Sequence, residues 1–157
     1  MKKLTTLLTV IVMTINFAFG QAQKANGYNY AGHTDFTAFW TDFKKAVASN
    51  DKQALIEMTK FTFTDFNQQA YGKSGLTCKT NVEFLNKLPQ IFPNCSINLF
   101  ENGKPEKLNA EMWSINEKNA GASYCLLGNG ACGVDILGYV FAKDKNVYKL
   151  VGLKYME

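Results

Sequence analysis

The chain has 157 residues, about the size of one domain, with 17 lysines, no arginine, 13 acidic residues and a formal net charge of +4. Arginine is the usual residue for bidentate recognition of phosphate and guanine, and the longest basic run is Lys44-Lys45. This composition argues against nucleic-acid binding. The absence of Gly-x-Ser-x-Gly, of a phosphate loop and of His-Glu-x-x-His argues against the hydrolases and nucleotidases that use those motifs.

Residues 1–20 have the pattern of a signal peptide. Lys2-Lys3 forms a positive start, Leu4–Phe19 is uncharged and mostly apolar, and Ala18-Phe19-Gly20 offers small residues for cleavage. The apolar run is short and rich in threonine for a membrane span, and no later segment is apolar enough to cross a bilayer. We therefore expect export to the periplasm or the cell exterior.

The mature chain is predicted to begin at Gln21. Residues 21–33 are small and polar and predict a flexible N-terminus, and residues 34–157 predict a single domain. Loss of Lys2 and Lys3 leaves 15 lysines against 13 acidic residues, which lowers the formal charge from +4 to +2.

Two helices are predicted first. Apolar residues recur at i, i+3, i+4, i+7 and i+11, as one stripe of Phe36, Phe39, Trp40, Phe43 and Val47. Thr34 or Asp35 is suited to cap this helix. Ser49-Asn50-Asp51 breaks the pattern and begins a second helix, whose expected buried residues are Leu55, Ile56 and Met58.

A short strand around Phe61 and Phe63 is followed by a loop over residues 65–77. Thr80 and Glu83 then match a capping box, which predicts a third helix. The expected buried face of that helix is Val82, Leu85 and Leu88, and Pro89 is expected to end or kink it.

The second half of the chain reads as strands, over Ser96–Phe100, Met112–Ile115, Ala122–Leu127, Val134–Ala142 and Val147–Tyr155. Helices followed by an antiparallel meander predict an α+β fold, with N-terminal helices packed on one face of a sheet.

Four cysteines in an exported chain favour disulfides. A two-residue turn at Gly128-Asn129 places Cys125 opposite Cys132, and this staple is the preferred pairing. A turn at Asn129-Gly130 instead places Cys132 opposite Leu127. Cys78 and Cys95 then pair by default or stay as buried thiols. Zinc is disfavoured, because Cys-x-x-Cys is absent and His33 is the single histidine.

Three stretches, at residues 35–63, 80–92 and 138–155, resemble small exported bacterial proteins of the NTF2-like, cystatin-like superfamily. The stretches are DFTAFWTDFKKAVASNDKQALIEMTKFTF, TNVEFLNKLPQIF and GYVFAKDKNVYKLVGLKY. The resemblance implies a curved sheet that wraps a cone-shaped pocket closed by helices, and a possible homodimer. The superfamily includes ketosteroid-isomerase-like enzymes, ligand-binding modules and interaction domains, so the fold alone does not give the function.

A proton-transfer enzyme of this fold needs a carboxylate and a hydroxyl donor in the pocket. Asp135, within an apolar strand, is the candidate acid, although an alternating strand more readily points it to water, beside a sheet edge. Tyr124 and Tyr139 are candidate donors, and Trp113 is a candidate pocket wall.

We expect a binding domain rather than an enzyme, without metal or cofactor. Its partner would be a small apolar or amphipathic molecule in the cone, with Trp113, Tyr124 and Tyr139 as lining, or another protein. One alternative is a lyase or isomerase that uses Asp135 and a tyrosine. Another is a secreted inhibitor or immunity-type protein that presents the Leu126–Ala131 loop, pinned by a disulfide.

Overall fold

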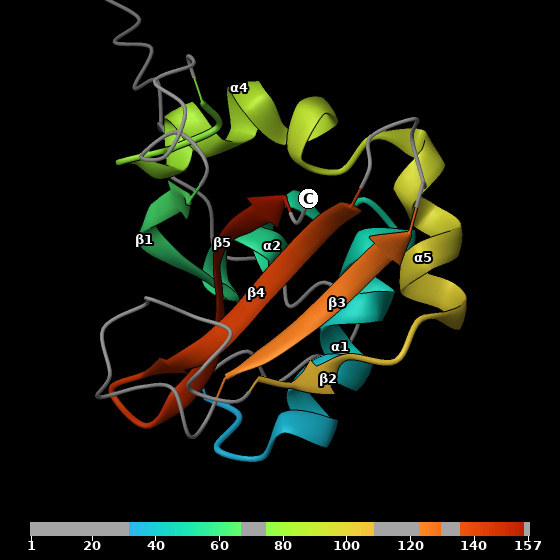
Figure 1. Ribbon diagram of the computed structural model, residues 1–157. Coiled ribbons are helices and arrows are strands. Elements are labelled where there is room, and N and C mark those ends of the chain that lie inside the picture. The colour runs from blue at the N-terminus through green and yellow to red at the C-terminus, as the bar shows by residue number, and fades with distance from the viewer. Residues whose placement is uncertain (1–31, 67–74, 109–122, 130–135, 156–157) are drawn as a thin grey trace, which may run out of the picture.

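The computed structural model describes residues 32–66, 75–108, 123–129 and 136–155 (Figure 1). Within them the chain forms two helices and a strand, then three helical segments, then four strands. In order these are α1 (Phe36–Ala48), α2 (Lys52–Glu57), β1 (Thr59–Asp65), α4 (Asn81–Ile91), the 3-10 turn η2 (Asn94–Ser96), α5 (Ile97–Asn102), β2 (Glu106–Lys107), β3 (Tyr124–Asn129), β4 (Ile136–Asp144) and β5 (Val147–Tyr155). The predicted α+β class is confirmed.

The strands form one open sheet in the order β1-β5-β4-β3-β2. β2 to β5 make the predicted antiparallel meander, but β1 pairs parallel to β5, so the sheet is mixed. The expectation of a wholly antiparallel sheet was wrong, because β1 is separated from the meander by α4 and α5 and adds at its far edge. Gly152 permits this pairing, since a Cβ there would lie 2.1 Å from the Thr64 carbonyl oxygen.

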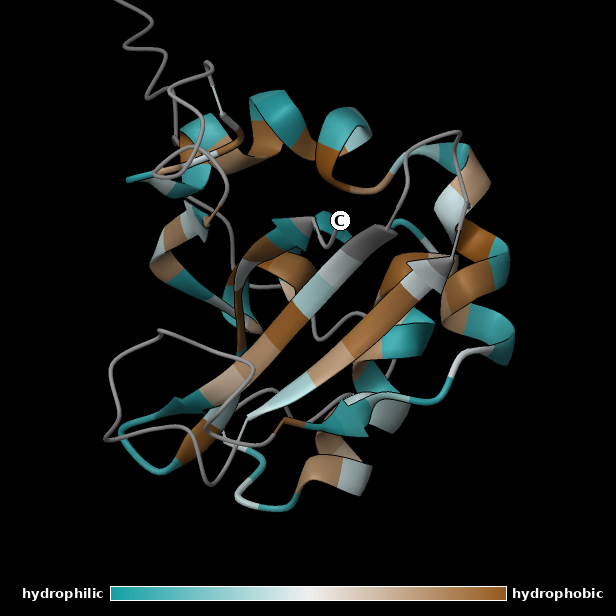
Figure 2. Ribbon diagram, in the orientation of Figure 1, coloured by the Kyte–Doolittle hydropathy of each residue, from teal (hydrophilic) through white to brown (hydrophobic). Residues whose placement is uncertain are grey.

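Helices α1 and α2 lie behind one face of the sheet, and α4 and α5 flank it (Figure 1). In Figure 2 the hydrophobic residues of β3, β4 and α5 lie together, while much of α4 is hydrophilic. The main core lies between the helices and the sheet, and it includes Phe39, Phe43, Phe84, Phe100, Tyr139 and Phe141, each at most 1% exposed. Burial of this aromatic surface is the main favourable contribution to folding.

The predicted first helix is confirmed. Asp35 caps it by accepting a hydrogen bond from the Ala38 backbone N–H at 3.0 Å, and the predicted stripe buries Phe39, Phe43 and Val47. Asp51 caps α2 in the same way, by accepting from the Ala54 N–H at 3.1 Å.

The capping box at α4 forms, but the predicted buried face was wrong in part. Thr80 Oγ1 accepts from the Glu83 N–H, and the Glu83 carboxylate accepts from the Lys79 N–H. The buried residues are Phe84, Leu88 and Ile91, whereas Val82 is 62% exposed. Phe84 sets this face because its large ring packs edge-on against Phe61 and Phe63.

Residues 96–100, predicted as a strand, are helical. The Ser96 hydroxyl donates to the Pro93 carbonyl, and α5 follows with Phe100 buried against Trp40 and Phe43. The predicted strand at Val147–Tyr155 is confirmed. The turn before it has Lys145 and Asn146 at positive φ, as a type I′ hairpin requires.

Candidate binding site

Tyr139, predicted as pocket lining, is a core residue. It is 0% exposed, and its hydroxyl donates to the Ile91 carbonyl at 2.7 Å. Phe92 stacks on its ring at 5.5 Å and Phe100 meets it edge-on at 4.6 Å. The hydroxyl therefore anchors the end of α4 to the sheet through this hydrogen bond.

Tyr124 also packs into the aromatic cluster. Its ring stacks on Phe36 at 3.6 Å and meets Tyr148 edge-on at 5.8 Å. Burial raises the pKa of Tyr148, and the neighbouring Tyr124 and Asp35 raise it further. Both rings close the end of the core near the start of α1.

Trp113 and Asp135 lie outside the described residues. Within the described residues the buried carboxylate is Asp65, which is 5% exposed and accepts from the Leu76 backbone N–H at 2.9 Å. The Asp65 N–H in turn bonds to Thr77 Oγ1 at 3.0 Å. This carboxylate ties two chain segments together, which is a structural role.

The space between α1 and the sheet is filled by rings in mutual contact. Phe43 alone has ring neighbours at 5.2–6.4 Å in Phe39, Trp40, Phe92, Phe100 and Phe141. In the described part of the chain, the interior expected to hold a ligand is thus occupied by the protein's own side chains.

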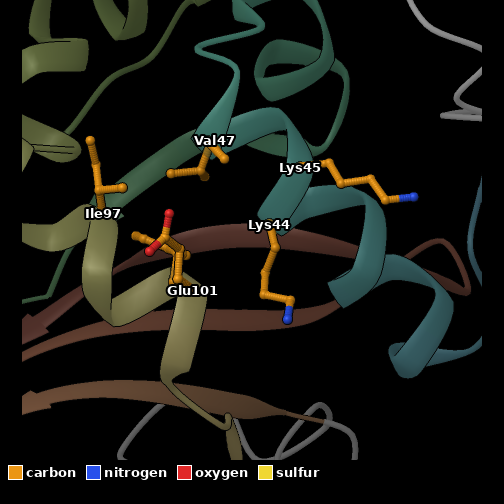
Figure 3. A pocket seen from close by; sticks show the side chains of 7 residues that line it. Lys44, Lys45, Val47, Ile97 and Glu101 are labelled. Atoms are coloured by element: carbon orange, nitrogen blue, oxygen red, sulfur yellow. The ribbon is translucent and has the colours of Figure 1, made fainter.

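An open hollow lies instead on the outer side of α1, where its last turns face α5. Its volume is about 260 Å³, and it is lined by Lys44, Lys45, Val47, Ala48, Ile97, Phe100 and Glu101. Figure 3 shows Ile97 and Glu101 of α5 across from Val47 and Lys44 of α1, with the Lys45 side chain extending away from α5.

A second hollow, of about 280 Å³, continues from the first toward α4. It is lined by Val47, Ala48, Asn50, Lys52, Leu55, Leu85, Leu88, Pro89, Phe92, Asn94 and Ile97. Since both hollows share Val47, Ala48 and Ile97, they form one surface, here named the helical groove.

The helical groove has an apolar floor and a mainly cationic rim. Its charged lining residues are Lys44, Lys45 and Lys52 against Glu101. The Lys44 ammonium lies 5.7 Å from the centre of the Trp40 ring, which holds it beside the groove. The Asp42 carboxylate lies 3.8 Å from the Lys45 ammonium and forms a hydrogen bond with His33 Nε2 at 3.0 Å.

The helical groove was not predicted from the sequence. Its one sequence signal is the Lys44-Lys45 pair beside the apolar stripe of α1. Its second wall, α5, falls on residues predicted as a strand, so the sequence did not place Ile97 and Glu101 opposite α1.

The preferred Cys125–Cys132 disulfide is not formed, and of the two alternatives left open for Cys78, a pair with Cys95 or a buried thiol, the structure has the buried thiol. Cys78 and Cys125 are both free and buried. The hairpin register explains why Cys125 does not meet Cys132: Cys125 pairs with Val140, and Asn129 at the end of β3 pairs with Ile136. The connection is therefore longer than a two-residue turn at Gly128-Asn129, and Cys132 lies outside the described residues.

Burial raises the pKa of the Cys125 thiol to about 12 and also raises that of Cys78, whose Sγ contacts the Leu76 carbonyl oxygen at 3.1 Å. Cys95 is disulfide-bonded, to a partner outside the described residues. The inhibitor hypothesis requires the Leu126–Ala131 loop to project from the surface. Leu126 is instead 1% exposed and part of the core, so its side chain is not presented to a partner.

The described residues contain no group of three metal-ligating side chains, and none of their helices is long and apolar enough to cross a membrane. Comparison of the chain with models of known families, with curated proteins and with solved structures finds no significant match.

Proposed function

We propose that the chain is a non-catalytic binding domain, exported to the periplasm or cell exterior, and that the helical groove is its binding surface. The observation that carries this proposal is the contrast between a filled interior and an open apolar groove on the same helix. Apolar hollows with a few polar groups at the rim are the usual form of a binding site.

Two features support a role without catalysis. The described buried carboxylate, Asp65, accepts from the Leu76 backbone N–H, and the buried Tyr139 hydroxyl donates to the Ile91 carbonyl. Neither group is available to move a proton on a bound molecule. The order of the elements, with helices first and an antiparallel run of strands last, supports the proposal of an NTF2-like architecture whose interior is filled by aromatic side chains.

The test uses a matched pair of variants on α1. Ala48 lines both hollows, whereas Ala38 lies on the exposed surface of the first turn and lines neither. Ala48→Trp fills the helical groove, and Ala38→Trp adds the same side chain elsewhere on the helix.

The probe is anilinonaphthalene sulfonate, an apolar dye with one negative charge, measured by fluorescence titration. The wild type and Ala38→Trp should bind it equally, and Ala48→Trp should bind it about tenfold more weakly, a difference of about 1.4 kcal/mol. Circular dichroism checks that both variants are folded. Equal binding by all three proteins, or no binding by the wild type, would refute the groove as the binding surface.

A further inference from the structure

We infer that the occupant of the helical groove is an amphipathic α-helix of another protein, with acidic residues beside its apolar face. This inference rests on the binding role proposed above and adds the class of partner. It follows from the shape of the groove, from its charge and from the surface around it.

The shape favours a row of side chains over one small molecule. The volume is divided between two hollows of about 260 and 280 Å³, and neither alone reaches the roughly 300–1,000 Å³ of a typical small-molecule cleft. Both are open, and they adjoin along Val47, Ala48 and Ile97, between helices α1, α4 and α5. Two apolar side chains from one face of a helix, three or four residues apart, would enter two such adjoining hollows.

The charge favours an acidic partner. Lys44 and Lys52 lie on the α1 and α2 side of the groove, and Glu101 lies on the α5 side. A bound helix would therefore place its acidic residues toward α1 and α2, and a basic residue is tolerated best toward α5. Complementary charge of this kind sets the orientation of a partner and speeds its association.

The surrounding surface does not favour an anionic membrane as the occupant. Peripheral membrane proteins insert a projecting apolar face into the bilayer, whereas this apolar surface is recessed between helices. Among the described residues the exposed large hydrophobic side chain is Val82, at 62%, and it does not line the groove.

The N-terminal segment of the chain is a poor match in charge. Residues 21–31 contain Lys24 and no aspartate or glutamate. A cationic rim therefore gains nothing from binding this segment, and an acidic partner complements the rim better.

The experiment compares two synthetic helical peptides with leucine at i, i+3, i+4 and i+7. One peptide has glutamates beside the leucines and the other has lysines. Affinities for the full mature chain are measured by fluorescence anisotropy. The charge-reversal variant is K44E/K52E, and the control is K79E/K107E, which changes the net charge equally at exposed positions outside the groove.

The wild type and K79E/K107E should bind the acidic peptide at least about tenfold more tightly than the basic peptide, and K44E/K52E should reverse this order. Equal affinities, or a preference that K79E/K107E abolishes equally, would overturn the inference. So would tighter binding to phosphatidylglycerol vesicles than to the acidic peptide, or self-association that Ala48→Trp prevents.

The dye titration separates this inference from the proposed function. Groove-dependent dye binding without peptide binding would contradict the helical partner and leave the proposed binding role in place. Absence of both dye binding and peptide binding would contradict both proposals.

Discussion

The two sides of α1 differ in how closely their neighbours pack against them. Toward the sheet, Phe39 and Phe43 are at most 1% exposed and pack against each other and against Phe141. Near the end of the helix, Val47 and Ala48 border open hollows. In the described residues the same helix thus covers the sheet with aromatic rings on one side and borders the open helical groove beside α5 and α4 on the other. In the described part of the chain, aromatic rings fill the space between α1 and the sheet, whereas the helical groove is open, and this contrast is why the groove is the binding surface proposed above.

The largest effect is expected on the closed side. Phe43→Ala removes a ring that is 0% exposed and in contact with five others, so it should lower the free energy of unfolding by about 3–5 kcal/mol. Urea denaturation measures this loss. Val82→Ala, at an exposed site on α4, is the control and should change stability by less than about 0.5 kcal/mol. A small effect of Phe43→Ala would mean that the core is not packed as described.

A smaller effect is expected at Tyr139. Tyr139→Phe leaves the Ile91 carbonyl without its buried donor and should cost about 1–2 kcal/mol of unfolding free energy. Dye binding should not change, because Tyr139 does not line the helical groove. A weaker dye affinity at unchanged secondary structure would show that the interior takes part in binding after all.

Cys125 tests how tightly the core is closed. Burial raises its pKa to about 12 from 9.0, so its thiolate is scarce at pH 8 and iodoacetamide should leave it unmodified in the folded protein. The exposed site of Val82→Cys should react rapidly under the same conditions. Tandem mass spectrometry of the labelled peptides measures both.

The raised pKa of the Cys125 thiol also makes the stability of the fold depend on pH. The unfolded chain loses the Cys125 proton near pH 9, whereas the folded protein keeps it until about pH 12. The stabilising contribution of this thiol is complete below pH 9 and falls as the pH rises toward 12. Cys125→Ala should therefore show a shallower loss of unfolding free energy over that range than the wild type, and an equal slope would contradict the burial of the thiol.

The smallest effect on stability is expected at the groove rim. Lys52→Gln alters an exposed side chain and should change the unfolding free energy by less than about 0.5 kcal/mol. It should nevertheless weaken binding of the anionic dye, since Lys52 lines the second hollow and supplies a positive charge there. A change in stability with no change in binding would assign Lys52 to the fold instead.

The sequence predicted well what depends on local pattern. The stripe from Phe36 to Val47 gave α1, and the alternation over Val147–Tyr155 gave β5, because each pattern is long enough to distinguish helix from strand. Residues 96–100 are too few for that distinction, and α5 was mistaken for a strand.

Features that depend on distant contacts were not predicted. The parallel pairing of β1 with β5 joins segments separated by most of the domain. The disulfide prediction depended on the length of one turn, and a register that pairs Cys125 with Val140 removes it. The helical groove arises from the approach of α1, α4 and α5 and has little signature in any one of them.

The pairing of β1 with β5 also sets when the chain can fold. Thr59 of β1 is in register with Leu150 of β5, and Phe39 and Phe43 of α1 pack on Phe141 of β4. The first third of the domain therefore cannot complete its packing until the last strands have been synthesised. Contacts of such wide sequence separation slow folding and leave apolar surface uncovered in the meantime. On the growing chain, the aromatic stripe of α1 is therefore an uncovered apolar surface of the kind that chaperones bind.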